Sequence, residues 1–159
     1  MKPILLATDG SPTAAEATKT AIEFATALDA PLLIVSIWDF ALEPVGIGFG
    51  PVIPDLDRVG HEQALKVVEE AAEPARKAGL DVETIIRRGT PVEQICAIAD
   101  EHDARLIVLG SHGWGPLRRT LFGSVSTGVL HHARQPVLVV RRCETVPATE
   151  AAEREKATV

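Results

Sequence analysis

One stretch of this chain decides its fold, Leu106-Ile-Val-Leu-Gly110-Ser-His-Gly113-Trp-Gly-Pro-Leu-Arg-Arg-Thr-Leu-Phe-Gly123-Ser124-Val-Ser126. An apolar run ends in glycines, and after a short loop a Gly-Ser pair opens a second apolar segment. A buried strand that enters a glycine-rich turn before a helix presents backbone N–H groups to phosphate. Glycine allows close backbone approach and positive φ without a Cβ clash. With the hydroxyls of Ser111, Ser124 and Ser126 as further donors, the stretch predicts a nucleotide site.

Strand-like and helix-like segments alternate along the rest of the chain. Short apolar runs predict strands over 4–8, 31–37, 82–88, 105–109 and 136–140, and helical periodicity predicts helices over 12–28, 56–78, 91–102 and 124–133. This alternation predicts an α/β fold, a parallel sheet with helices on both faces and right-handed crossovers. Ligands in such sheets bind beyond the carboxyl ends of the strands, where the strand order reverses. Asp9 and Gly110 follow the first and fourth strands, so both would line one crevice if these strands are neighbours.

Helix starts and buried helix faces also have sequence signals. Ser11-Pro12 predicts an N-cap followed by proline in the first turn, and Thr90-Pro91 predicts the same for the third helix. The spacing of apolar residues predicts two buried stripes, Ala14, Ala17, Ala21, Phe24, Ala25 and Leu28 on the first helix and Leu65, Val68, Ala72 and Ala75 on the second.

Length and composition predict one domain. The chain has 159 residues, is 46% hydrophobic but only 4% aromatic, and so needs an aliphatic core. We expect a single domain over 1–142, a long loop over 38–54, and a disordered tail over 143–159, where there is little to bury.

Charge and cysteine content exclude several classes. A net charge of −6 argues against a nucleic-acid binder, which needs a basic face. No apolar run is long enough for a membrane span, and Asp9 interrupts the N-terminal apolar stretch too early for a signal peptide. Cys96 and Cys143 follow no metal-ligand spacing and are interpreted as reduced thiols. The expected location is the cytoplasm, with no membrane and no nucleic acid as partner.

Two motifs resemble those of the universal stress protein family. Gly110, two residues, Gly113, nine residues and then Gly123-Ser124 is similar to the ATP-binding signature of that family, and Ile4-Leu-Leu-Ala-Thr8-Asp9-Gly10-Ser11 is similar to its first strand and acidic turn. The resemblance runs from about residue 2 to residue 142. It implies a three-layer, open, five-stranded parallel sheet of order 3-2-1-4-5, of the adenine nucleotide alpha hydrolase-like type.

The same resemblance implies ATP as the ligand and a set of binding residues. Ala7 and Thr8 would lie under the nucleotide, although many family members have proline where Ala7 stands. Asp9 would contact the ribose or a metal-bridged group, and Ile37 the adenine. The phosphates and ribose would be held by Gly110, Ser111, His112, Gly113, Trp114, Gly115, Pro116, Gly123, Ser124, Val125 and Ser126. The plainer interpretations are turn glycines, a turn aspartate and a core isoleucine, and an Mg²⁺ requirement stays open.

Other polar residues give weaker signals. Arg118 or Arg119 could reach a terminal phosphate, although exposed loop arginines are usually solvated. The pair His131-His132 has no third ligand at a sensible spacing, so no metal site is expected, and no catalytic residue is assigned.

Three functions remain open at this point. The resemblance implies an ATP-binding sensor or switch in stress response. A slow ATP hydrolase or phosphotransferase is the alternative, although the signature has no Gly-Lys-Ser/Thr loop and no lysine. The third is a dimeric interaction module without nucleotide. A dinucleotide oxidoreductase is disfavoured because the first turn lacks three glycines. The apolar last strand, Val137 to Val140, would be an exposed sheet edge, which predicts a homodimer through it.

Overall fold

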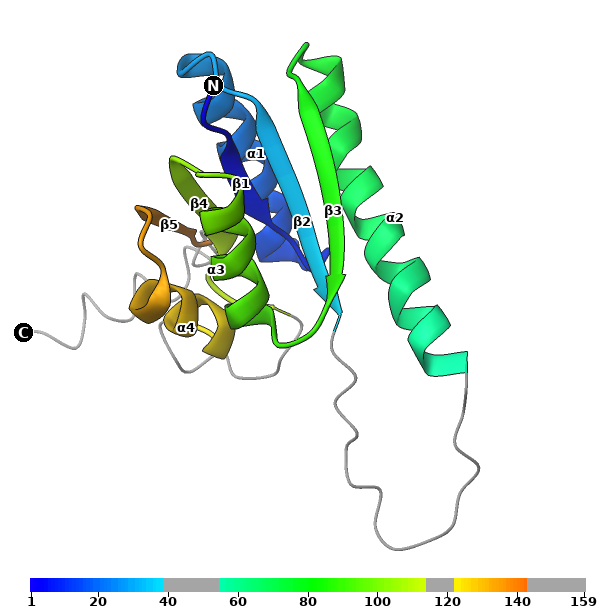
Figure 1. Ribbon diagram of the computed structural model, residues 1–159. Helices are drawn as coiled ribbons and strands as arrows, with labels where there is room; N and C mark the ends of the chain where they lie inside the picture. The colour runs from blue at the N-terminus through cyan, green and yellow to red at the C-terminus, as the bar shows by residue number, and fades with distance from the viewer. Residues whose placement is uncertain (39–54, 114–121, 143–159) are drawn as a thin grey trace, which may run out of the picture.

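The computed structural model describes residues 1–38, 55–113 and 122–142, without the side chains of residues 55 and 56. These residues form a five-stranded parallel sheet in the order β3-β2-β1-β4-β5 (Figure 1). The strands are β1 (Ile4–Ala7), β2 (Leu32–Trp38), β3 (Val82–Arg88), β4 (Leu106–Gly110) and β5 (Val137–Val140). The predicted parallel α/β class and the implied strand order are both confirmed. Trp38, predicted as the first residue of the loop over 38–54, is instead the last residue of β2. The rest of that loop and the predicted tail lie outside the described residues.

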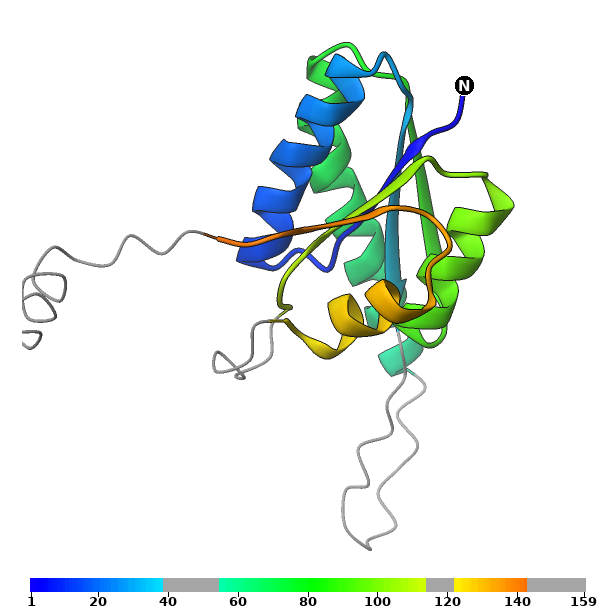
Figure 2. The ribbon, with the colours of Figure 1, turned by 90° about the vertical axis from the view of Figure 1, so that its left-hand side faces the viewer.

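Two helices cover each face of the sheet. Figure 2 shows the sheet between α1 (Pro12–Ala27) and α2 (Asp55–Lys77) on one side and α3 (Pro91–Glu101) and α4 (Ser124–His132) on the other. Every strand and helix begins and ends within one residue of its predicted bounds, because glycine, proline and capping residues mark these bounds in the sequence.

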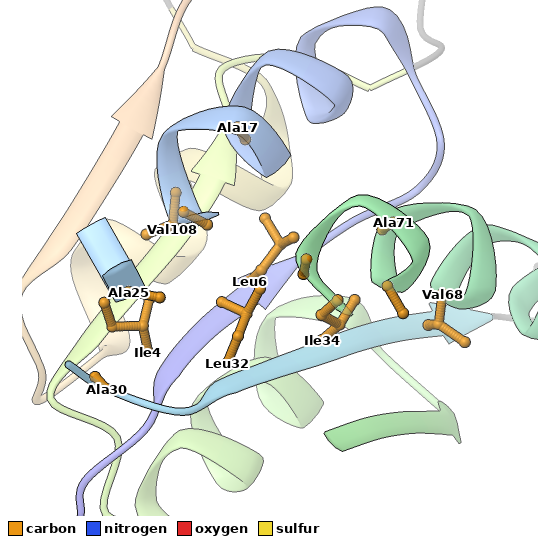
Figure 3. Packing of buried hydrophobic residues seen from close by; sticks show 13 residues of the cluster. Ile4, Leu6, Ala17, Ala25, Ala30, Leu32, Ile34, Val68, Ala71 and Val108 are labelled. Atoms are coloured by element: carbon orange, nitrogen blue, oxygen red, sulfur yellow. The ribbon is translucent and has the colours of Figure 1, made fainter. Parts of the chain in front are cut away.

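The sheet has a separate apolar core on each face. Along β1, Ile4 and Leu6 pack against α1 and α2, while Leu5 and Ala7 pack against α3 and α4. Figure 3 shows the first of these cores, where strand side chains meet the alanines of α1 and the residues Val68 and Ala71 of α2. Burial on both faces explains why the strands appear as continuous apolar runs in the sequence.

Three large side chains do not lie where the periodicity placed them. Phe24, Leu28 and Leu65 are about 40% exposed (41%, 40% and 43%). The buried stripe of α1 consists of small residues that let the helix lie close to the sheet, and Phe24 lies on its flank. Leu28 is the C-cap, beyond the last helical turn, and Leu65 lies beside the buried stripe of α2.

The two predicted helix caps differ. The Ser11 hydroxyl accepts a hydrogen bond from the Ala14 N–H at 3.3 Å, as an N-cap should. Thr90 has the extended N-cap backbone conformation, but its side chain makes no capping hydrogen bond. The predicted N-cap position of Thr90 is therefore confirmed, but the side-chain hydrogen bond that usually accompanies a threonine N-cap is absent. Proline at N1 follows it, as predicted.

The alanine stripe of α1 generates a prediction about stability. Ala21 is fully buried between α1 and the sheet, whereas Ala15 is exposed on the same helix. We expect Ala21→Leu to lower the free energy of unfolding by about 1–3 kcal/mol, because the extra methylenes overpack the contact. The matched change Ala15→Leu should alter it by less than about 0.5 kcal/mol. Urea denaturation followed by circular dichroism measures both, and equal effects would contradict the close packing of α1.

Candidate functional site

A cavity of about 330 Å³ opens at the carboxyl ends of the strands. The chain passes from β1 outward to β2 and β3 and then returns to β4 on the other side of β1, so the strand order reverses between β1 and β4. The cavity lies at this reversal. Its wall consists of Ala7, Thr8, Asp9, Ala14, Val35, Ile37, Pro91, Ile95, Leu109, Gly110, His112, Gly113, Gly123, Ser124, Val125 and Ser126.

Most of the sequence-predicted residues line this cavity. They are Ala7, Thr8, Asp9, Ile37, Gly110, His112, Gly113, Gly123, Ser124, Val125 and Ser126. Ser111 lies behind the wall, 2% exposed. Trp114, Gly115 and Pro116, with Arg118 and Arg119, lie outside the described residues. The folded chain thus brings three distant segments to one cavity.

Five wall residues were missed by the sequence reasoning, namely Ala14, Val35, Pro91, Ile95 and Leu109. The side-chain period of a strand could have found Val35, which lies two residues before Ile37 on the same face of β2. No local signal points to Pro91 and Ile95, because only the crossover of α3 over the sheet brings them to the cavity.

The turn after β1 is held by its own side chains. The Ser11 N–H donates to Asp9 Oδ1 at 3.0 Å, and the Gly10 N–H donates to Thr8 Oγ1 at 3.3 Å. Gly10 has a φ of +74°, a conformation that favours glycine. This turn fixes the Asp9 carboxylate at the mouth of the cavity, where a Cβ on Gly113 would overlap Asp9 Oδ2.

The loop after β4 is fastened to the first turn of α1. The His112 carbonyl accepts hydrogen bonds from Ser11 Oγ, at 3.3 Å, and from Thr13 Oγ1. Two residues before His112, a Cβ on Gly110 would lie 2.9 Å from the backbone nitrogen of Ala14. Only glycine allows this approach between β4 and α1.

Close approach, and not positive φ, explains glycine at two of the described signature positions, Gly110 and Gly113. The described glycines with positive φ are Gly10, Gly79 and Gly89, and Gly110, Gly113 and Gly123 are not among them. The expectation that the signature turns through positive φ was therefore wrong for these three positions. A Cβ would meet the α1 backbone at Gly110 and the Asp9 carboxylate at Gly113. At Gly123 a Cβ would lie 3.4 Å from the Ser111 carbonyl oxygen, an ordinary contact, so close approach does not require glycine there.

The N-terminus of α4 forms a polar wall of the cavity. Gly123 is its N-cap, and the Gly123 N–H donates to the Ser111 carbonyl at 2.7 Å. Beyond it, the N–H groups of the first turn of an α-helix have no acceptor within the helix and form the positive end of its dipole. In α4 this turn begins at Ser124, whose exposed side chain lies in the wall.

The Ser126 hydroxyl donates its proton to carbonyl groups of the protein itself. Ser126 Oγ lies 3.0 Å from the carbonyl oxygens of both Ser111 and Gly123 and donates to them. Since a serine hydroxyl has a single proton, Ser126 can offer a ligand only an oxygen lone pair. It fastens α4 to the end of β4, and it is 2% exposed.

The opposite wall is apolar. Val35 and Ile37 of β2 and Pro91 and Ile95 of α3 carry no side-chain donor or acceptor, and Val35 and Ile95 belong to one core cluster, with Ile37 packed against it. The cavity therefore has a polar wall formed by the 110–113 loop and α4 and an apolar wall formed by β2 and α3. Such a pairing suits a ligand with one anionic and one flat apolar part.

Across residues 1–38, 55–113 and 122–142, no three His, Cys, Asp or Glu side chains lie close enough together to hold a metal ion. Cys96 is a free thiol, and burial, with a smaller effect of Asp100, raises its pKa. Within the same ranges no helix combines the length and apolarity that a membrane crossing needs.

Fold and cavity together define a doubly wound α/β protein with a binding-type cavity at its topological switch point. The chain belongs to the universal stress protein family, whose model matches residues 1–141. Universal stress protein MJ0531 of Methanocaldococcus jannaschii is 36% identical over 145 residues, which cover 89% of this chain and 82% of that protein.

Two solved structures with bound nucleotides are similar to this fold. A universal stress protein in complex with cAMP superposes with a TM-score of 0.64 and 27% identity, covering 88% of this chain and 96% of that one. The universal stress protein of Archaeoglobus fulgidus in complex with dAMP superposes with a TM-score of 0.64 and 26% identity, covering 88% and 98%.

The Ser126 bridge is testable without any ligand. We expect Ser126→Ala to lower the free energy of unfolding by about 1 kcal/mol, because a buried hydrogen bond from α4 to Ser111, the residue after β4, is lost. Thr127→Ala, on the exposed side of the same helix, should change it by less than about 0.5 kcal/mol. Urea denaturation measures both, and a neutral Ser126→Ala would show that the bridge does not hold α4.

Proposed function

We propose that this protein binds an adenine nucleotide, with ATP as the physiological ligand, and acts as a nucleotide-dependent sensor or switch in stress response. The single observation that carries the proposal is the cavity at the strand-order reversal, with a helix N-terminus on one wall and an apolar surface on the other. The cAMP and dAMP complexes of two family structures support the adenine nucleotide class. ATP itself is what the signature implies.

The polar wall suits the phosphates. First-turn N–H groups of α4, the helix dipole and the Ser124 hydroxyl attract an anion locally, and the net charge of −6 does not oppose this because the donors are backbone groups. The Asp9 carboxylate would repel a bare phosphate. In the proposal it therefore contacts the ribose or a metal-bridged group, and Mg²⁺ would be an additional ligand of the nucleotide and not a resident ion.

The apolar wall suits the base. A purine presents two flat apolar faces, and Ile37, Val35 and Ile95 offer a matching surface without unpaired side-chain polar groups. In the proposal the base lies against Ile37, and the ribose lies between the two walls, near Asp9.

Binding, and not dedicated catalysis, is the activity that this cavity supports. Rapid phosphoryl transfer needs cations that neutralise the developing charge, and the described residues that line the cavity include no lysine or arginine. A ligand held by the 110–113 loop, α4 and β1 together would stabilise one arrangement of these segments. The ligand would thereby change the surface that is available to a partner protein. The size of this change is limited by the difference between the ligand's affinities for the two conformations. We place this activity in a single domain over 1–142, followed by a tail over 143–159, in the cytoplasm.

The first experiment identifies the ligand that the protein carries. Freshly purified protein is denatured, and the released small molecules are identified by mass spectrometry. ATP is expected, and its slow conversion to ADP on incubation would add hydrolase activity to the switch. No carried nucleotide, together with no calorimetric binding of ATP with or without Mg²⁺, would overturn the proposal in favour of a dimeric module.

Two cavity variants and one control sharpen the test. Gly113→Ala places a methyl group against Asp9 Oδ2, and Ser124→Ala removes a hydroxyl at the α4 N-terminus. Each should weaken ATP binding roughly tenfold or more, the loss expected when one good polar contact is removed or displaced. Thr127→Ala should bind like the unchanged protein. Isothermal titration calorimetry measures all four proteins, and unchanged affinity in both cavity variants would place the ligand elsewhere.

We also propose that two copies associate through β5. This strand is an edge of the described sheet, and its four residues are apolar and only partly buried. Analytical ultracentrifugation at roughly tens of micromolar protein should show a dimer, since association depends on concentration. Val139→Pro should shift the protein toward monomer, because proline removes an edge N–H. A wild-type protein that sediments only as a monomer would contradict this pairing.

A further inference from the structure

A glycine outside the signature lies at a close contact between α3 and α4, the two helices that contribute residues to the cavity wall. Gly128 lies in the middle of α4, where glycine is a poor helix former compared with alanine. A Cβ at this position would lie 2.6 Å from Cγ2 and 3.1 Å from Cγ1 of Val92 in α3. Carbon atoms at rest are about 3.5–4.0 Å apart, so a single added methyl group would force the two helices apart by about 1 Å.

Neither partner can easily avoid this contact. Both methyl groups of Val92 face Gly128, and valine in a helix has one strongly preferred rotamer. The start of α4 is fastened to the end of β4 by the bonds that Gly123 and Ser126 make to the Ser111 carbonyl. We therefore expect the first turn of α3 to move when a methyl group is added at Gly128.

That first turn forms part of the cavity wall. Pro91 and Ile95 flank Val92 along α3 and line the cavity, while Ser124 and Val125 line it from α4 one turn before Gly128. Neither Gly128 nor the Val92 side chain belongs to the wall. The contact between them thus lies directly behind the cavity and determines how far α3 stands from α4.

We propose that Gly128, through its contact with Val92, is a positioning residue that holds the apolar α3 wall against the base of the bound nucleotide. This inference rests on the proposed function and deepens it, because it assigns base contact to the α3 wall and phosphate contact to α4. A change at Gly128 acts on the base and is independent of the number of phosphates. A change at Ser124 acts on the phosphates.

Calorimetric titration with ATP, AMP and adenosine tests this assignment. Gly128→Ala should weaken binding of all three by a similar factor, roughly tenfold, because overpacking displaces the wall. Ser124→Ala should weaken ATP and AMP but leave adenosine nearly unchanged. Adding Val92→Ala to Gly128→Ala makes room for the new methyl group and should restore most of the lost affinity. Thr127→Ala, at the neighbouring exposed position of α4, is the control.

The outcomes separate this inference from the function on which it rests. Wild-type protein that binds none of the three ligands overturns the proposed function and the inference with it. Wild-type binding that Gly128→Ala leaves unchanged, or that Val92→Ala fails to restore, overturns the inference alone. Should Gly128→Ala alone fail to fold in a thermal melt, the double variant decides. Folding with near wild-type affinity supports the contact, and folding with weak binding overturns it.

Discussion

The close approach between the end of β4 and the first turn of α1 is the constraint on which the cavity depends. Gly110 leaves no room for a Cβ beside the Ala14 backbone, and Ser11 and Thr13 hold the His112 carbonyl from the same helical turn. These contacts add to the parallel pairing of β1 with β4 at the point where the strand order reverses. The position of α4 depends on this loop, because the helix is hydrogen-bonded to Ser111 within it.

The second constraint passes from that loop to α4. The Ser111 carbonyl accepts from the Gly123 N–H and from Ser126 Oγ, so the helix begins at a defined distance from the loop end. This places the positive end of the α4 dipole beside the turn that carries Asp9. The two groups act differently on an anion, because the Asp9 carboxylate repels it and the helix N-terminus attracts it. In the proposed binding mode the ribose lies near Asp9 and the phosphates lie at the N-terminus of α4.

Most of the fold could be predicted because its signals are local. Apolar runs, prolines in first turns and glycines at helix ends mark each strand and helix within one residue. The wrong predictions concern which side chains of a helix are buried, because an amphipathic pattern marks the apolar face but not the residues that contact the sheet. Phe24 and Leu65 have the apolar character of core residues, yet the alanines beside them are what fit against the sheet. Thr90 occupies a cap position without making a cap bond.

The sequence by itself determined the alternation of strands and helices, the family signature and the residues at the carboxyl ends of β1, β2 and β4. These depend on spacing along the chain, which a sequence displays directly. Only the tertiary structure decided that Pro91 and Ile95 complete the cavity, that Ser126 faces inward to two carbonyls, and that Gly128 meets Val92. Those features depend on how far apart packed helices stand, a distance set by side chains from segments that no local pattern connects.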